Sequence, residues 1–208
     1  CCLVVKPRNS TAIGRVEMLG GEFCGNATRS VVWLLTEGKE GKGLVETSSC
    51  SQPLKYRIKD EIVALVMPKP KVSQTEKGLA VTFDGITQIV TSTKATRPLL
   101  EQLINDETLG WNKLPAVGVT NHDPMTRQAR FSVWVKDVNT IFDETACGSG
   151  TAAIGIVQAY QTKQYHQLKV LQPSGETMQV SAGTNGEVEI SGAVDILFAG
   201  EIELDSDS

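Results

Sequence analysis

Short stretches in which apolar and polar residues alternate, or in which β-branched residues gather, follow one another along most of the chain. This pattern is typical of strands rather than of long helices. Asp60 separates two such stretches as in a hairpin, and Pro68 and Pro70 stop the second one. We therefore expect a sheet-rich protein with strands at residues 15–19, 44–49, 54–59, 61–67, 86–93, 116–120, 130–136, 168–172, 177–182, 187–191 and 193–204.

Three segments break this pattern and predict helices, at residues 27–36, 98–103 and 151–161. The first and the last are rich in small and β-branched residues and carry few charges, which is typical of a helix that is buried on all sides. Each of these two follows a cysteine–glycine turn, so the order strands, helix, strands occurs twice. The sequence thus predicts strands wrapped around a buried central helix in each of two domains.

The repeat also suggests where the domains lie. We place the first domain at residues 1–85 together with 195–208, and the second at 86–194. The chain opens on Cys1-Cys2-Leu3-Val4-Val5, which resembles a strand entered midway. We therefore expect a further segment before residue 1, and this opening shows no secretion signal.

The composition narrows the class of protein. Of 208 residues, 40% are hydrophobic and 21% are charged, as in ordinary globular proteins. The net charge of −4 and the pI near 5.3 show no excess of basic residues that could bind a phosphate backbone, so we expect no nucleic-acid partner. The longest apolar runs are too short to cross a bilayer, so we expect no membrane partner.

The cysteines argue against a disulfide framework and against a metal site. Their number, five, is odd, and no Cys-x-x-Cys pair is accompanied by a second pair of ligands. Only His122 and His166 could add ligands, and we interpret both as ordinary loop residues. We therefore expect a reducing, cytoplasmic location and no metal, and we interpret Cys1, Cys2 and Cys50 as structural.

Two cysteines stand in near-duplicate contexts, 123 residues apart: Cys24-Gly25-Asn26-Ala27-Thr28 and Cys147-Gly148-Ser149-Gly150-Thr151. A thiol at a helix N-terminus faces unpaired backbone N–H groups and the positive end of the helix dipole, which favours the thiolate. A single cysteine in such a place is most often a small buried apolar residue. The duplication instead indicates two half-sites that meet and act as a pair.

Two thiols that face each other at converging helix starts could invert a stereocentre. A thiolate on one side of an α-carbon would remove its proton, and a thiol on the other side would return one. Dipoles aimed at the developing carbanion would supply the driving force, so we predict catalytic Cys24 and Cys147 and no cofactor. A cradle for the substrate's α-carboxylate would be formed by the backbone N–H groups of Gly25, Asn26, Gly148, Ser149 and Gly150.

Acidic residues shortly before the second cysteine could hold the amine of an amino-acid substrate. Glu144 and Asp143 lie three and four residues before Cys147. Asp137 is a weaker case of the same kind. The other interpretation, that these are solvated loop acids or part of a helix cap, stays open.

At these motifs the chain resembles the diaminopimelate epimerase superfamily of cofactor-independent racemases and isomerases. The motifs of that family read approximately Cys-Gly-Asn-Gly/Ala and Ala-Cys-Gly-Thr/Ser-Gly, and residues 24–27 and 146–150 match both in order. Gln-Pro-Ser-Gly at residues 172–175 also resembles the family's Pro-Gly-Gly element. The resemblance covers essentially the whole chain. It implies an α+β fold of two similar domains, each with a barrel-like sheet around a central helix that begins at a catalytic cysteine.

Two departures narrow this resemblance. Diaminopimelate epimerases carry a Glu-Arg pair shortly before the second cysteine, where the arginine holds the distal carboxylate, and here Val138-Asn139 stands in that place. Residues 21–28 and 147–155 instead resemble the histidine racemases of opine metallophore (staphylopine-type) biosynthesis, which implies D-histidine as the product. The family also has a longer segment before its first motif, which supplies opening strands and part of the substrate pocket.

The leading hypothesis is a cofactor-independent amino-acid racemase with histidine as its small-molecule substrate. A diaminopimelate epimerase, or another racemase or isomerase of this fold, is the alternative within the class; an isomerase of the phenazine-biosynthesis type would use an acid in place of the thiol pair. From other classes, a non-catalytic amino-acid-binding relative and a redox-sensing dithiol stay open. The sequence also leaves the oligomeric state open, a homodimer included.

Overall fold

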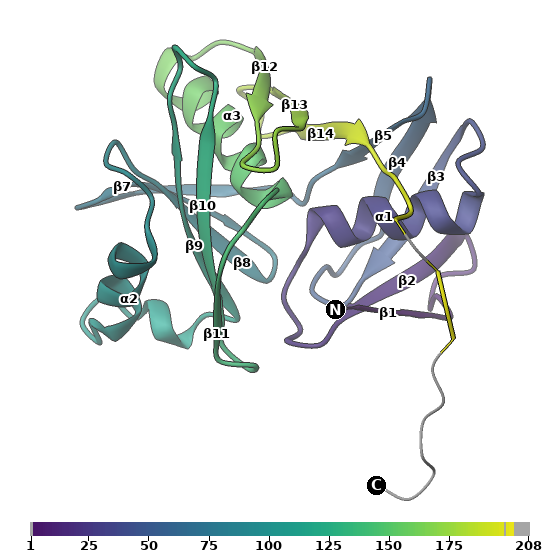
Figure 1. The fold of residues 1–208 in the computed structure, drawn as a ribbon, viewed down its shortest axis with the longest axis horizontal. Coiled ribbons are helices and arrows are strands. Elements are labelled where there is room, and N and C mark those ends of the chain that lie inside the picture. The colour runs from purple at the N-terminus through teal and green to yellow at the C-terminus, as the bar shows by residue number, and fades with distance from the viewer. Residues whose placement is uncertain (1, 198, 202–208) are drawn as a thin grey trace, which may run out of the picture.

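The computed structural model describes residues 2–197 and 199–201, and over these residues a pair of sheets surrounds and flanks three α-helices (Figure 1). The helices are α1 (Gly25–Thr36), α2 (Arg97–Asn105) and α3 (Gly148–Thr162), and a short 3-10 helix is η1 (Trp111–Lys113). The strands of the first sheet are β1 (Cys2–Val5), β2 (Ala12–Met18), β3 (Gly41–Thr47), β4 (Leu54–Lys59), β5 (Ile62–Val66), β12 (His166–Leu171), β13 (Thr177–Ala182) and β14 (Val188–Ala193). The strands of the second sheet are β6 (Lys71–Thr75), β7 (Gly78–Phe83), β8 (Ile86–Val90), β9 (Ala116–His122), β10 (Ala129–Val135) and β11 (Thr140–Asp143).

The sheets are mainly antiparallel. The first has the order β1-β2-β3-β4-β5-β14-β13-β12, and the second has the order β11-β10-β9-β8-β7-β6. Each contains one parallel pair whose connection runs through a helix: α1 links β2 to β3, and α2 links β8 to β9. The α+β, sheet-rich architecture predicted from the sequence is therefore confirmed.

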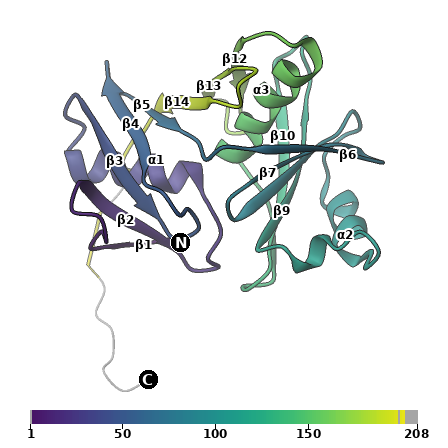
Figure 2. The same ribbon diagram turned by 180° about the vertical axis from the view of Figure 1, so that it is seen from behind.

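The two helices that follow the cysteines are packed differently. The helix α1 contacts β2 to β5 on one side, and its other side stays partly exposed. The helix α3 lies between β12 to β14 and β7 to β9, so it is buried along most of its length (Figures 1 and 2). A close approach makes this possible, since a Cβ on Gly155 would lie only 2.7 Å from Val180 Cγ2 of β13.

A buried arginine fastens the last strand to the first half of the molecule. Arg29 of α1 is 4% exposed, and its Nε donates to the carbonyl oxygen of Val63 at 3.0 Å. Its Nη2 donates to the carbonyl oxygens of Gly192 and of Ala193, the latter at 3.1 Å. One side chain therefore joins α1, β5 and β14.

The strands predicted in the first half agree well with the structure. The hairpin expected around Asp60 is present, with Lys59 of β4 opposite Ile62 of β5. Its turn residues Asp60 and Glu61 have φ of 50° and 62°, as a tight two-residue hairpin requires. All three predicted helices are also confirmed, each extended by one or more residues.

Three strands of the second sheet, β6, β7 and β11, were not predicted. The prediction of a strand at 193–204 is wrong for the residues that the structure describes, because β14 ends at Ala193 and residues 194–197 and 199–201 form no strand. The rest of that segment lies outside the described residues. Ala193 pairs with Ile62, the first residue of β5, so β5 offers no partner to the residues that follow Ala193.

The division into domains stays a prediction. The eight-stranded sheet is continuous through the pairing of β5 with β14, and the pair β7 and β8 spans the proposed boundary after residue 85. Residues 198 and 202–208 of the segment assigned to the first domain lie outside the described residues.

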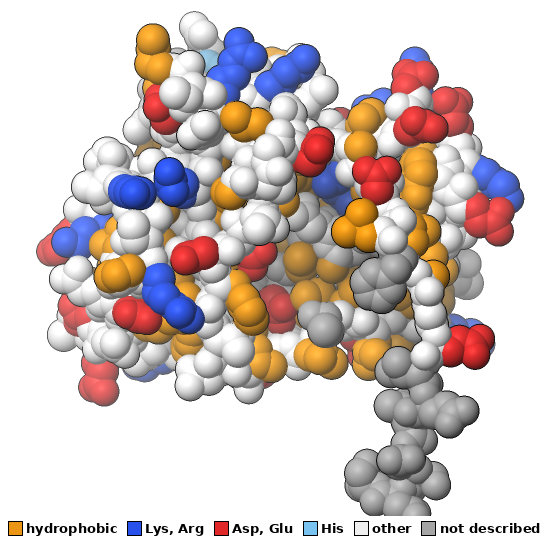
Figure 3. Space-filling model, viewed as in Figure 1, with side chains coloured by type: hydrophobic (Ala, Val, Ile, Leu, Met, Phe, Trp, Pro, Cys, Tyr) orange, Lys and Arg blue, Asp and Glu red, His pale blue; other side chains and the backbone are white. Residues whose placement is uncertain are grey.

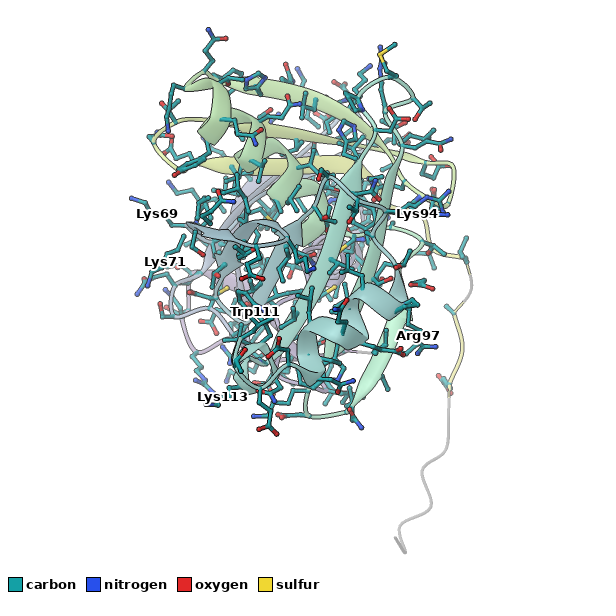
Figure 4. The ribbon with its side chains drawn as sticks, turned by 90° about the vertical axis from the view of Figure 1, so that its left-hand side faces the viewer. Lys69, Lys71, Lys94, Arg97, Trp111 and Lys113 are labelled. Carbon is teal, nitrogen blue, oxygen red and sulfur yellow. The ribbon has the colours of Figure 1, made fainter. Side chains whose placement is uncertain are left out.

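The surface near α2 and η1 carries several basic side chains. Figure 4 shows Lys69 and Lys71 at one side of this face and Lys94 and Arg97 at the other, with Trp111 between them. The positive charges are thus spread over the face. None of the helices in the described portion of the chain is long and apolar enough to cross a membrane.

Candidate active site

The two motif cysteines cap their helices with the same geometry. Cys24 precedes α1 with φ −129° and ψ 107°, and Cys147 precedes α3 with φ −134° and ψ 110°. Each sulfur accepts the backbone N–H of the residue three positions later, at 3.4 Å: Ala27 for the first and Gly150 for the second. The cysteine–glycine turn that occurs twice in the sequence is therefore a helix cap of the same geometry in both places.

The starts of α1 and α3 lie side by side. Asn26 Nδ2 donates to the carbonyl oxygen of Ala146, directly before the second cysteine, at 2.9 Å. A Cβ on Gly148 would lie 3.1 Å from Asn26 Oδ1 and 2.9 Å from Ile190 Cδ1. This approach needs a glycine at residue 148. The positive ends of the two helix dipoles consequently meet at one place.

A cavity of about 490 Å³ lies at this meeting point, a size typical of small-molecule sites. Figure 3 shows apolar and acidic side chains in the hollow between the two halves of the molecule. The cavity wall contains both motif cysteines. The predicted site residues that line it are Cys24, Gly25, Asn26, Glu144, Cys147, Gly148 and Ser149.

The structure separates the acidic residues that precede the second cysteine. Glu144 lines the cavity, whereas Asp137 is exposed in the turn between β10 and β11 and does not line it. The carboxylate of Asp143 accepts a hydrogen bond from Ser132 Oγ instead. Of the three, only Glu144 is placed to meet a ligand in the cavity.

A buried glutamine from β8 lies beside the second sulfur. Gln88 is fully buried, and its Nε2 lies 3.7 Å from Cys147 Sγ and 2.9 Å from Ser149 Oγ. Thr120 Oγ1 donates to Gln88 Oε1 at 2.8 Å and so fixes which end of the amide faces the sulfur. The amide has room because its partner across the strands is Gly118, where a Cβ would lie 2.3 Å from Gln88 Oε1.

A second buried glutamine holds the backbone of the same cysteine. Gln172 is 2% exposed, and its Oε1 accepts the N–H of Cys147 at 3.1 Å. Its Nε2 donates to Val170 O and to Thr151 Oγ1, both at 3.1 Å. The predicted cradle residue Gly150 gives its N–H to Cys147 Sγ and does not line the cavity.

Sequence reasoning missed three residues of this site. Gln88 is a polar residue on a strand of apolar neighbours, which is a weak signal of a buried hydrogen-bonding role. Gln172 stands out in the sequence only as a member of a family-like element. Glu22, which lines the cavity, stands two residues before Cys24 within the quoted motif, but nothing in the sequence singles it out.

Burial raises the pKa of the Cys24 thiol to about 11, and the charges of Glu144 and Glu22 act in the same direction. Burial raises the pKa of Cys147 to about 12. Hydrogen bonds from Ala27 to Cys24 and from Ser149 and Gly150 to Cys147 oppose these shifts but are outweighed. The expectation that the helix starts make thiolates is therefore corrected: in this structure both thiols are protonated near neutral pH.

The electrostatics also couple the groups to one another. A charge on Cys24 adds to the rise in the pKa of Cys147, so ionisation of one sulfur opposes ionisation of the other. Burial, together with the charge of Glu22, raises the pKa of the Glu144 carboxyl. Once one sulfur is ionised, the other stays protonated. One base and one acid on opposite faces of a carbon atom are what acid–base catalysis of inversion needs.

Solved structures with a similar fold include epimerase-like proteins. A predicted epimerase from Pseudomonas aeruginosa superposes with a TM-score of 0.61 at 16% identity, over 95% of this chain and 84% of that one. A phenazine biosynthesis protein of the PhzF family from Enterococcus faecalis gives 0.57 at 17% identity, over 98% and 82%. The fold is thus epimerase-like.

The sequence comparisons are more specific. The family described as Histidine racemase CntK N-terminal domain matches residues 2–202, and the chain belongs to this family. A histidine racemase from Fusobacterium nucleatum is 29% identical over 91% of this chain and 78% of its own length. One from Staphylococcus aureus is 27% identical over 79% of this chain and 66% of its own length.

Proposed function

We propose that this chain is an amino-acid racemase that inverts the α-carbon of histidine, with Cys24 and Cys147 as acid and base and without a cofactor. The observation that carries the mechanism is that two helix-capping cysteines of matching geometry line one cavity. Membership of the family, and relatives that are named histidine racemases, support the substrate.

The cavity offers groups for both ends of an α-amino acid. The adjoining starts of α1 and α3 favour an α-carboxylate, which would meet the backbone of Gly25, Asn26, Gly148 and Ser149. Glu144 would receive the α-ammonium group. Asn26 Oδ1, which is buried and has no partner among the described residues, can accept a hydrogen bond from the same group.

The proton transfer uses one thiolate and one thiol. The thiolate takes the α-proton, the electron pair stays on the α-carbon, and the opposite thiol gives its proton to the other face. The product is the enantiomer, and the two sulfurs have exchanged protonation states. Because the pKa values are about 11 and 12, against about 8.5 for a free cysteine, each thiolate is a stronger base than usual. The difference between the pKa of the thiol and the much higher pKa of the α-proton is therefore smaller than for an ordinary cysteine.

Several finer features belong to the same proposal. A division into two units, with one sheet region around each capped helix, is supported by the contacts of α1 with β2 to β5 and of α3 with β8, β9 and β12 to β14. A reducing, cytoplasmic setting would keep the thiols free; Cys24 and Cys147 are unpaired in the structure. Use of D-histidine in metallophore synthesis stays a prediction from the resemblance.

The cavity favours histidine over diaminopimelate. Val138, which stands where diaminopimelate epimerases have the glutamate of their Glu-Arg pair, lines the cavity. No lysine, arginine or histidine is among the described residues that line it. The distal carboxylate of diaminopimelate would therefore enter a cavity that already holds Glu22 and Glu144 and whose described lining offers it no basic side chain.

Exchange of the α-proton, followed by NMR, tests this function. The reduced protein, with any segment that precedes residue 1 in the natural chain, is incubated in D₂O with a panel of L-amino acids that includes histidine and diaminopimelate. We expect deuterium at the α-carbon of histidine together with formation of D-histidine. Exchange of another amino acid alone would keep the mechanism and change the substrate, and no exchange with any would favour a non-catalytic binder.

A further inference from the structure

One carboxylate of the cavity has no assigned task. Glu22 lies in the loop between β2 and α1 and lines the cavity. Its Oε2 is buried and has no hydrogen-bond partner among the described residues. A Cβ on Gly20 would lie 2.7 Å from this oxygen, so the backbone at Gly20 leaves the room that the carboxylate occupies. A buried carboxylate oxygen without a donor is costly, and a ligand that donates to it would remove that cost.

The charge around Glu22 is one-sided. Glu144 from the opposite half faces the same cavity, and its pKa is raised by burial together with the charge of Glu22. The described lining contains no basic side chain, so none of its side chains balances the second carboxylate. A ligand with two positive groups would balance both, whereas an ordinary amino acid brings only its α-ammonium group.

The rest of the wall is suited to a flat ring. The apolar residues Phe23, Ile86, Val133, Val135 and Phe142 line the same cavity as the two carboxylates. Such a surface accepts the faces of an aromatic ring, and a carboxylate at its border accepts from a ring N–H. An imidazolium has apolar faces, two N–H donors and one positive charge.

We propose that Glu22 is a specificity-determining residue that makes the cavity select a substrate with a positively charged side chain, so that histidine binds as its imidazolium. This rests on the proposed racemase function and deepens it, because it assigns the protonation state of the substrate and the residue that selects it. Glu144 then binds the α-ammonium group of the substrate, and Glu22 binds its side chain.

The test compares L-histidine with L-2-thienylalanine, an amino acid whose five-membered aromatic ring has no titratable nitrogen. The quantity measured is the ratio of kcat/KM for the two substrates between pH 6 and 9, in the wild type and in Glu22→Gln. The other thiols and the other carboxyl that line the cavity, those of Cys2, Cys24, Glu144 and Cys147, face both substrates alike, so their effects largely cancel in the ratio.

In the wild type we expect histidine to be preferred, and the preference to fall by up to about tenfold per pH unit above about pH 6.5, where imidazolium loses its proton. In Glu22→Gln the preference should fall by about 10- to 100-fold, mainly through a higher KM for histidine, and become nearly independent of pH. A wild-type ratio that rises with pH or stays flat would show that neutral imidazole binds. That result, or an unchanged ratio in Glu22→Gln, would overturn the proposal.

Matched variants separate this from other effects. Glu144→Gln should lower kcat/KM for both substrates by the same factor and leave the ratio of the two values unchanged. Glu107→Gln removes the same charge from an exposed residue outside the cavity and should change nothing. Isothermal titration of both ligands over the same pH range measures selection without turnover. If histidine binds with the expected pH dependence but is not racemised, the proposed function fails while the assignment of Glu22 stands.

Discussion

Replacing Gln88 by methionine is the most informative test of how the site supports a thiolate. The variant Gln88→Met keeps the length of the side chain but removes the Nε2 donor that lies 3.7 Å from Cys147 Sγ. A hydrogen bond to a charged acceptor contributes about 1.5–3 kcal/mol, so kcat/KM should fall by about 10- to 150-fold. Because the equilibrium constant between enantiomers is unity by symmetry, this loss must be equal in both directions.

The same change should also cost stability, by an amount that the structure bounds. It leaves the buried hydroxyls of Thr120 and Ser149 without the amide, each at about 1–3 kcal/mol. Ser149 Oγ lies 3.5 Å from Cys147 Sγ and can turn to it, which leaves only Thr120 unsatisfied. We therefore expect a loss of about 2 kcal/mol in the free energy of unfolding.

Racemisation followed by chiral chromatography, with urea unfolding at the same pH, measures both effects. The rising part of the pH–rate profile should move to higher pH in Gln88→Met, because the Cys147 thiolate loses a hydrogen-bond donor. Gly118→Ala provides a second variant, because its Cβ would lie 2.3 Å from Gln88 Oε1 and displace the amide without removing it. A variant that loses stability but keeps kcat/KM within twofold of the wild type would refute the role given to Gln88.

Three further predictions concern protonation and packing. At saturating L-histidine, where loss of free imidazolium does not limit binding, the rate of α-proton exchange should rise steadily from pH 7 to beyond pH 9, because the base must be a thiolate and burial raises the pKa values to about 11 and 12; a plateau near pH 8.5 in the pH–rate profile would contradict this. Gln172→Ala leaves the buried N–H of Cys147 without its acceptor, so it should lower the free energy of unfolding by about 1–3 kcal/mol and also lower kcat. An unchanged midpoint of urea unfolding would argue against this hydrogen bond. Arg29→Met should lower the free energy of unfolding in urea by about 2–4 kcal/mol, because it leaves carbonyl oxygens of β5 and β14 without a donor. Stability equal to that of the wild type would show that water replaces the guanidinium.

The sequence predicted the elements of the molecule that local chemistry determines. Both capped helices were predicted because a cysteine–glycine turn before a run of small residues specifies their start. The hairpin at Asp60 followed from alternation on either side of a turn. The strand β6 was missed because Lys71–Thr75 is a largely exposed edge strand with few apolar residues, and Pro68 and Pro70 indicate the end of a strand rather than the approach to one.

The site was predicted where it is local and missed where it is assembled from distant segments. Cys24 and Cys147 could be paired because their contexts repeat. Gln88 lies 59 residues before Cys147, and only the register of β8 against β9 places its amide beside the sulfur. The acids near Cys147 could not be distinguished by spacing, since the strand β11 and its pairing decide that Glu144 faces the cavity while Asp137 stays in a turn.

The central claim, that two thiols act on opposite faces of one α-carbon, is tested most directly by Cys24→Ser and Cys147→Ser. The matched control is Cys50→Ser, which removes a half-buried thiol outside the cavity. Reduced proteins are incubated with L-histidine in D₂O, and both deuteration and D-histidine are measured. We expect Cys50→Ser to behave as the wild type and each of the other two variants to form no D-histidine while still folded. Near-normal inversion by either Cys24→Ser or Cys147→Ser would contradict the two-thiol mechanism.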